Sequence, residues 1–62
     1  MLNDFSSCYA AARRAYYEHQ YNYAGDLFIR AKQYAMSEFA KGECDWWLGL
    51  CRAANRRGYA TV

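Results

Sequence analysis

The chain has 62 residues and carries a net charge of +2, from eight basic and six acidic side chains. This charge is too small to indicate nucleic-acid binding by itself. A chain of this length forms a single domain, residues 1–62, with a marginal core that dense helix packing or oligomerisation commonly supports. Proline is absent and glycine is scarce, so the sequence predicts an all-α fold.

The first helix is predicted over about residues 4–19, with Asn3 or Asp4 as its N-cap. Its apolar positions recur every three or four residues and so form one stripe. The stripe consists of Phe5, Cys8, Tyr9, Ala12, Ala15, Tyr16 and His19. It breaks after His19, where Asn22 is a suitable cap for the following helix.

The second helix is predicted over about residues 22–40. Small and aromatic residues alternate along it at steps of three and four, as in a helix that packs closely on others. These residues are Tyr21, Ala24, Phe28, Ala31, Ala35 and Phe39. The expected inner face of the helix also includes Leu27 and Tyr34. Gly42 is expected to end the helix, since glycine readily adopts the left-handed conformation of a C-cap.

The third helix is predicted over about residues 44–57, with acidic residues near its start, where the helix dipole favours them. Its inward face is expected to consist of Trp47, Leu50, Cys51 and Ala54. Gly58 would end it, and the tail 59–62 is expected to fray. Because the linkers are short, the three helices should be antiparallel neighbours: a helical hairpin with a third helix packed on it.

Seven tyrosines, three phenylalanines and two tryptophans are more aromatic residues than one small core can bury, so some should face a partner. Trp46 and Trp47 are adjacent, and a helix directs them about 100° apart. Trp47 continues the core stripe, which leaves Trp46 either as an anchor of an interface or packed at the edge of the bundle.

Gly49 is either a tolerated surface glycine or a point of close helix–helix contact, for example across a homodimer.

Arg52, Arg56 and Arg57 gather near the end of the third helix. They could contact phosphates or an acidic partner. Cations at a helix C-terminus need no ligand, however, because they offset the helix dipole. We favour this second interpretation and keep nucleic acid as a secondary partner.

No pattern for catalysis, for a metal or for another cofactor is recognisable, and an enzyme is not expected. Cys8, Cys44, Cys51 and His19 lack the paired spacing of zinc ligands. An odd number of cysteines without a recognisable signal peptide is typical of reduced thiols in the cytoplasm. No stretch approaches the roughly 18 apolar residues of a membrane span.

The spacing of Tyr21, Ala24, Phe28 and Ala31 resembles the second helix of a tetratricopeptide repeat. Trp47 falls near the position where the next repeat would begin with its tryptophan. This resemblance implies a helical hairpin of the tetratricopeptide type.

From about Tyr9 to Arg57 the chain also resembles the negative regulators of AraC-type activators, small bacterial proteins of similar length. The segments that carry the resemblance are YNYAGDLFIRA, from Tyr21 to Ala31, and WWLGLCRAANRR, from Trp46 to Arg57. It implies a negative regulator of transcription that contacts an AraC-type activator directly and blocks its dimerisation or its binding to DNA.

We expect a homo-oligomer or a component of a larger complex that acts by protein contact. The expected contact surface comprises Trp46, Tyr17, Tyr23, Ile29 and Arg52, which lie outside the core stripes. The alternative is a small DNA-associated regulator, of phage or mobile-element origin, that contacts phosphates through Arg52, Arg56 and Arg57. An adaptor of the toxin–antitoxin or secretion-chaperone type also remains open, because it would use the same hairpin.

Overall fold

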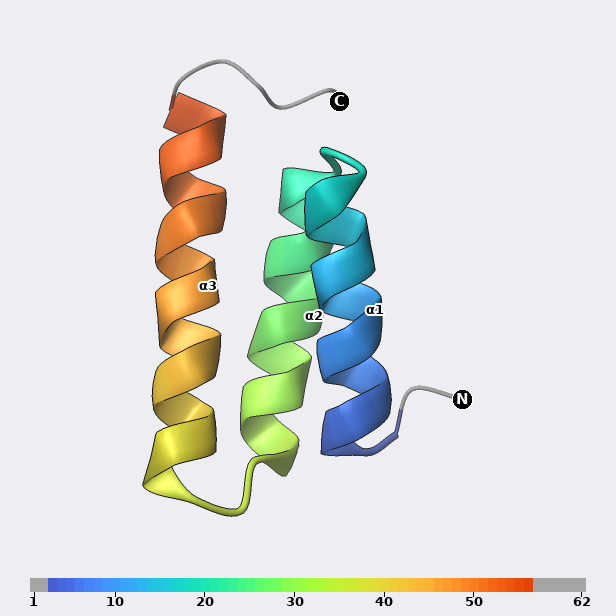
Figure 1. Cartoon of the computed structure of the whole chain (residues 1–62), viewed down its shortest axis with the longest axis vertical. Coiled ribbons are helices and arrows are strands. Elements are labelled where there is room, and N and C mark those ends of the chain that lie inside the picture. Colours follow the sequence, from blue (N-terminus) through green and yellow to red (C-terminus); the bar gives the residue numbers. More distant parts are fainter. Residues whose placement is uncertain (1–2, 57–62) are drawn as a thin grey trace.

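Three α-helices make up the fold in the computed structural model, which describes residues 3–56. They are α1 (Phe5–Tyr17), α2 (Tyr21–Tyr34) and α3 (Glu38–Arg56), and no strand is present within residues 3–56. α1 and α3 run in the same direction and α2 runs antiparallel to both (Figure 1). The predicted all-α, three-helix architecture is therefore confirmed. Arg57, the predicted stop at Gly58 and the tail 59–62 lie outside the described residues.

The start of α1 is fixed by a side-chain cap, as predicted. The Asp4 carboxylate accepts a hydrogen bond from the backbone N–H of Ser7 at 2.8 Å. At the other end, His19 has a positive φ of 65° in the turn between α1 and α2. This left-handed conformation lets three residues reverse the chain direction.

The predicted cap at Asn22 is wrong, because α2 begins one residue earlier, at Tyr21. Gln20 is the N-cap and makes no side-chain capping bond. The side-chain oxygen of Asn22 instead accepts a hydrogen bond from the Asn55 amide at 2.9 Å. Asn22 therefore links the start of α2 to the end of α3.

The boundary between α2 and α3 lies earlier than predicted. α2 ends at Tyr34, and Ala35 has an extended backbone with ψ of 135°. Ser37 caps the start of α3, since its hydroxyl accepts a hydrogen bond from the Ala40 N–H at 3.1 Å. Phe39 and Gly42 therefore lie inside α3, and the predictions that Phe39 belongs to the inner face of the second helix and that Gly42 ends it are wrong.

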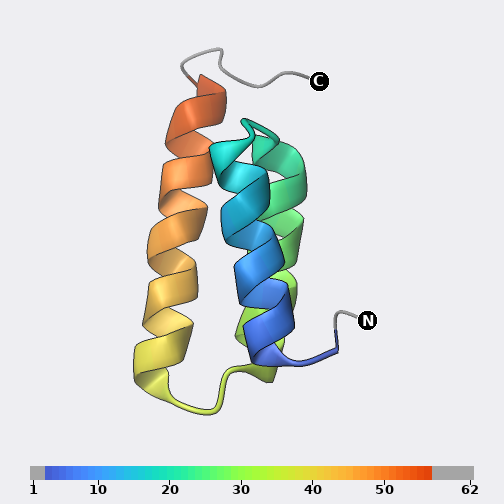
Figure 2. The same cartoon turned by 45° about the vertical axis from the view of Figure 1, so that its right-hand side comes forward.

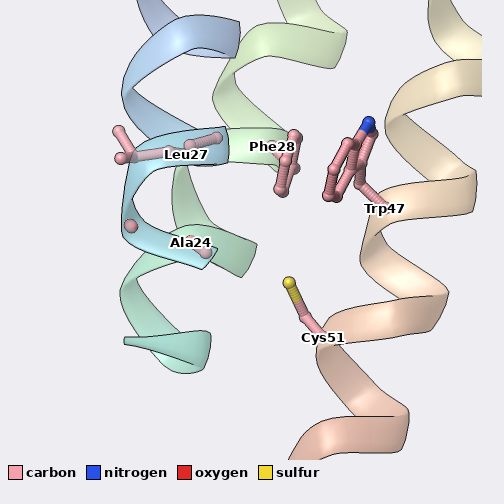
Figure 3. Packing of buried hydrophobic residues seen from close by; sticks show 7 residues of the cluster. Ala24, Leu27, Phe28, Trp47 and Cys51 are labelled. Atoms are coloured by element: carbon pink, nitrogen blue, oxygen red, sulfur yellow. The ribbon is translucent and has the colours of Figure 1, made fainter. Parts of the chain in front are cut away.

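The core lies along α2, where the predicted alternation of small and aromatic residues is buried. Tyr21, Ala24, Phe28 and Ala31 are each at most 7% exposed. Small buried residues of α1 lie against them, and α3 contributes Trp47 and Cys51 (Figure 3). Leu50, predicted in the inward face of the third helix, is only partly buried, and Tyr34 is 39% exposed.

α2 packs against both of the other helices. α3 lies beside the α1–α2 pair in both views (Figures 1 and 2). One surface ion pair, between Lys32 of α2 and Asp45 of α3 at 2.8 Å, also joins these helices. As for membrane insertion, none of the helices within residues 3–56 has the length and apolarity that crossing a bilayer requires.

Gly49 offers a test of α3, because it lies in the interior of this helix and is exposed. A Cβ atom at this position would meet no atom within 4 Å. We expect Gly49→Ala to raise the free energy of unfolding of the dilute protein by about 0.5–1 kcal/mol, because alanine loses less backbone entropy on folding. Urea unfolding followed by circular dichroism measures the change, and a lower stability would contradict the assigned helix.

Candidate functional site

Trp47 lies where the three helices meet. Its ring stacks on Phe28 of α2, with ring centroids 5.3 Å apart and an interplanar angle of 11° (Figure 3). It also meets Tyr16 of α1 edge to face at 5.3 Å. Only 8% of Trp47 is exposed, so its assignment to the core is confirmed.

A short hydrogen-bonded chain connects Trp47 to the surface. The indole N–H of Trp47 donates to the hydroxyl of Tyr9 at 2.8 Å. The Tyr9 hydroxyl in turn donates to a carboxylate oxygen of Glu43 at 3.3 Å. Burial raises the pKa of the Tyr9 phenol, and the negative charge of Glu43 raises it further, so the hydroxyl stays protonated and can donate.

Arg13 covers the outer side of these hydrogen-bonded residues. Its guanidinium carbon lies 6.0 Å from the centroid of the Tyr9 ring and 5.9 Å from that of Trp47. At these distances a cation is attracted to the face of an aromatic ring. A positive charge is thereby held against an aromatic surface between α1 and α3.

A groove of about 530 Å³ runs along this side of the molecule, between α1 and the first half of α3. We call it the aromatic groove. It is lined by Tyr9, Arg13, Glu38, Phe39, Gly42, Glu43, Trp46 and Trp47. Its walls combine aromatic rings with one basic and two acidic side chains, which suits an apolar ligand that carries a few polar groups.

Two large aromatic residues in this lining are open to solvent. Phe39 is 75% exposed and Trp46 is 62% exposed. They lie seven residues apart on α3 and therefore on the same side of the helix. Gly42 lies between them, and nothing lies within 4 Å of the position of its missing Cβ atom. The glycine therefore leaves the surface of α3 open beside the two rings.

The structure separates the five residues of the predicted contact surface. Trp46 lines the aromatic groove, whereas Arg52 lies further along α3, on an exposed position. Tyr17, Tyr23 and Ile29 are exposed by 63%, 53% and 49%, as expected for residues outside the core, but they do not line the groove. Tyr23 borders a different hollow, beside Arg14.

The sequence pattern does not predict that Phe39, Gly42 and Arg13 line the groove. Its periodicity places Phe39 on the inner face of the second helix and so does not indicate it as a site residue. The signal that could have found it is the spacing of seven from Trp46, with a glycine between them. Nothing in the sequence pattern indicated that Arg13 would lie over Trp47.

The arginines near the end of α3 have a simpler environment. Arg52 and Arg56 are both exposed and lie four residues apart, on one side of the helix. Arg57, the third residue of the predicted phosphate-contacting cluster, lies outside the described residues.

Cys8, Cys44 and Cys51 are buried, and none of them forms a disulfide. Within residues 3–56, no three histidine, cysteine, aspartate or glutamate side chains lie close enough together to hold a metal ion. Burial raises the pKa of the Cys51 thiol, and burial together with Asp45 and Glu43 raises that of Cys44. The Cys44 and Cys51 thiols therefore remain protonated at neutral pH and are poor nucleophiles.

Comparison with known proteins gives no match: no family model, no curated protein and no solved structure matches this chain.

The hydrogen bond between Trp47 and Tyr9 provides one test of the site. Tyr9→Phe removes the acceptor of the indole N–H, so we expect the free energy of unfolding to fall by about 1 kcal/mol. Tyr23→Phe is the matched control, since the Tyr23 ring is 53% exposed and its change should have little effect. Urea unfolding measures both variants, and equal stabilities would contradict a role for the bond.

The Cys44 and Cys51 thiols predict a dependence of stability on pH. In the unfolded chain they lose their protons near pH 8.5, whereas in the folded protein they keep them to a higher pH. Their contribution to the free energy of unfolding should therefore be constant below about pH 8 and should fall as the pH rises above this value. Cys51→Ala should reduce this slope when urea unfolding is measured across the range. An unchanged slope would contradict the raised pKa of Cys51.

Proposed function

We propose that this protein is an interaction module that binds a helix of another protein in the aromatic groove. The observation that carries the proposal is the exposure of Phe39 and Trp46, by 75% and 62%, on one side of α3. Large aromatic side chains supply much of the energy of protein interfaces, and tryptophan is especially frequent among residues critical for binding.

The shape of the groove favours a helix as the ligand. The groove follows α3, and Phe39 and Trp46 are separated by about 10 Å along the helix, at 1.5 Å per residue. A partner helix presents apolar side chains at similar intervals of one or two turns. Arg13, Glu38 and Glu43 at the groove could pair with charges beside those apolar side chains and so set the direction in which the helix binds.

The resemblance to negative regulators of AraC-type activators supplies a partner. In this proposal the protein binds an AraC-type transcription activator and blocks its dimerisation or its binding to DNA. The three buried cysteines form no disulfide, which fits a reducing compartment such as the cytoplasm.

A second candidate function rests on Arg52 and Arg56, which are exposed on one side of α3. With Arg57 they could contact DNA phosphates, as in a small DNA-associated regulator. Such binding would weaken steeply with salt, and the loss of each phosphate contact would lower the salt slope by about one. Binding of a protein helix in an aromatic groove should depend far less on salt.

The proposal is tested with an AraC-type activator from the same genome and a reporter gene driven by its promoter. We expect co-expression of the wild-type protein to reduce reporter output, and Phe39→Ala and Trp46→Ala each to relieve this reduction. With purified proteins, each variant should bind the activator at least about tenfold more weakly, as for an interface residue critical for binding.

Ile29→Ala and Tyr23→Ala are the matched controls, since these residues are also about half exposed but lie outside the groove. Both should retain wild-type repression. Binding that is unaffected by Phe39→Ala and Trp46→Ala would contradict the groove as the binding site. Retention of DNA by the protein alone, lost in Arg52→Ala and Arg56→Ala, would favour the second candidate.

A further inference from the structure

The spacing of small and aromatic residues in α2 recurs in α3. In α2 the inner ladder comprises Tyr21, Ala24, Phe28 and Ala31. In α3 the outer ladder comprises Phe39, Gly42, Trp46 and Gly49, again aromatic, small, aromatic and small at steps of three, four and three. The inner ladder is buried against neighbouring helices, whereas every residue of the outer ladder is exposed.

The glycines of the outer ladder face away from the hairpin, whereas Phe39 and Trp46 also border the aromatic groove. The buried side of α3 consists of Cys44, Trp47, Cys51 and Ala54. At 100° per residue, Gly42 and Gly49 lie about opposite this side of the helix. A Cβ atom at either glycine would meet nothing within 4 Å, so the backbone is open to the close approach of another helix.

Charge is distributed unevenly beside the outer ladder. Glu38 and Asp45 lie on one edge of it in the first half of α3, and Arg52 continues the same seven-residue spacing in the second half. Arg56 is in the last turn and also borders the ladder. Lys41 lies on the same edge and pairs with Glu38 at 3.5 Å, and Asp45 pairs with Lys32 of α2 at 2.8 Å. Both pairs are at the surface, where such ion pairs are weak. Along this edge of α3, the first half therefore has two acidic side chains and one basic side chain, and the second half is basic.

We propose that α3 pairs with α3 of a second copy of this chain in an antiparallel arrangement. Two-fold symmetry then places the acidic half of each helix beside the basic half of the other, which brings Glu38 near Arg56 and Asp45 near Arg52 of the second copy. A parallel arrangement would place like charges side by side. Antiparallel helix dipoles favour the same choice.

The ladder fixes the register of the pair. When Glu38 is level with Arg56 of the second copy, Trp46 lies close to the level of Gly49 of that copy. Gly42 then lies close to the level of Ala53 of the second copy. Each tryptophan then packs over a glycine of the other helix, where the absent side chain leaves room for the ring. The match of large on small residues explains why two glycines stand in the interior of α3, where each costs helix stability.

The two copies would meet through one helix each, so the interface lies at the small end of the specific range, below about 1,200 Å². We therefore expect a reversible dimer that forms in the micromolar range rather than an obligate one. This inference does not depend on the proposed function, since self-association is measured without the activator.

Sedimentation velocity of the full chain over a range of concentrations measures the self-association. The wild type is expected to be monomeric when dilute and dimeric when concentrated. Trp46→Ala and Phe39→Ala should each raise the dimer dissociation constant at least about tenfold. Ile29→Ala and Tyr23→Ala, at exposed positions of α2, are the controls and should dimerise as the wild type does.

A charge exchange tests the antiparallel arrangement at low salt. The two-fold dimer contains the contact between Glu38 and Arg56 twice. Glu38→Arg and Arg56→Glu each make both of these contacts repulsive, so each variant alone should dimerise at least about fivefold more weakly. An equimolar mixture should regain the wild-type affinity, because each contact in the mixed dimer again joins opposite charges. Both residues are exposed, and circular dichroism confirms that each variant keeps its helices.

A monomeric wild type at every concentration would overturn the proposal and assign the outer ladder to a different partner. A dimer that is insensitive to Trp46→Ala and Phe39→Ala would place the interface elsewhere. A mixture that dimerises no better than the separate charge variants would overturn the antiparallel register.

Discussion

The position of α3 depends on Trp47. Its ring stacks on Phe28 of α2, meets Tyr16 of α1 edge to face and donates its indole N–H to Tyr9. One side chain thus joins the third helix to both helices of the hairpin. The small residues that line the α1–α2 contact let those two helices pack closely, so a large ring is needed to bridge α1 and α3. The aromatic groove lies beside this bridge, where Trp47 and Arg13 line it together with the exposed rings of Phe39 and Trp46.

Fixing Trp47 in the core also determines where Trp46 lies. Neighbouring residues in a helix point about 100° apart, so the second tryptophan is turned out to solvent. Its ring centroid lies 5.2 Å from that of Trp47, in an edge-to-face contact that orients the exposed ring. An ordered aromatic ring loses less entropy on binding than a mobile one, which makes Trp46 a better anchor for a partner than a freely rotating side chain would be.

The three helices, the Asp4 cap, the buried inner ladder and the division between Trp46 and Trp47 could be predicted from periodicity and capping rules. The boundary between α2 and α3 could not. Steps of three and four continue without a break from Phe28 through Ala31, Ala35 and Phe39 to Gly42, so the periodicity does not show where one helix ends. The hydroxyl of Ser37 decides the boundary, because it caps a new helix within this pattern. Because the predicted boundary placed Phe39 in the second helix, the sequence did not indicate Phe39 as part of the candidate site. The groove itself depends on side-chain contacts between α1 and α3, which no local sequence pattern encodes.

The aromatic groove and the outer ladder share three residues: Phe39, Gly42 and Trp46. A helix of the activator and α3 of a second copy would therefore compete for the same side of α3. If the dimer forms in the micromolar range, a dilute protein would present a free groove, whereas a concentrated one would cover much of it. Self-association would then lower the apparent affinity for the activator in proportion to the fraction of monomer. Repression would therefore rise less than linearly with the amount of protein. Arg56→Glu should dimerise poorly but keeps both aromatic residues. At high expression this variant would repress more strongly than the wild type.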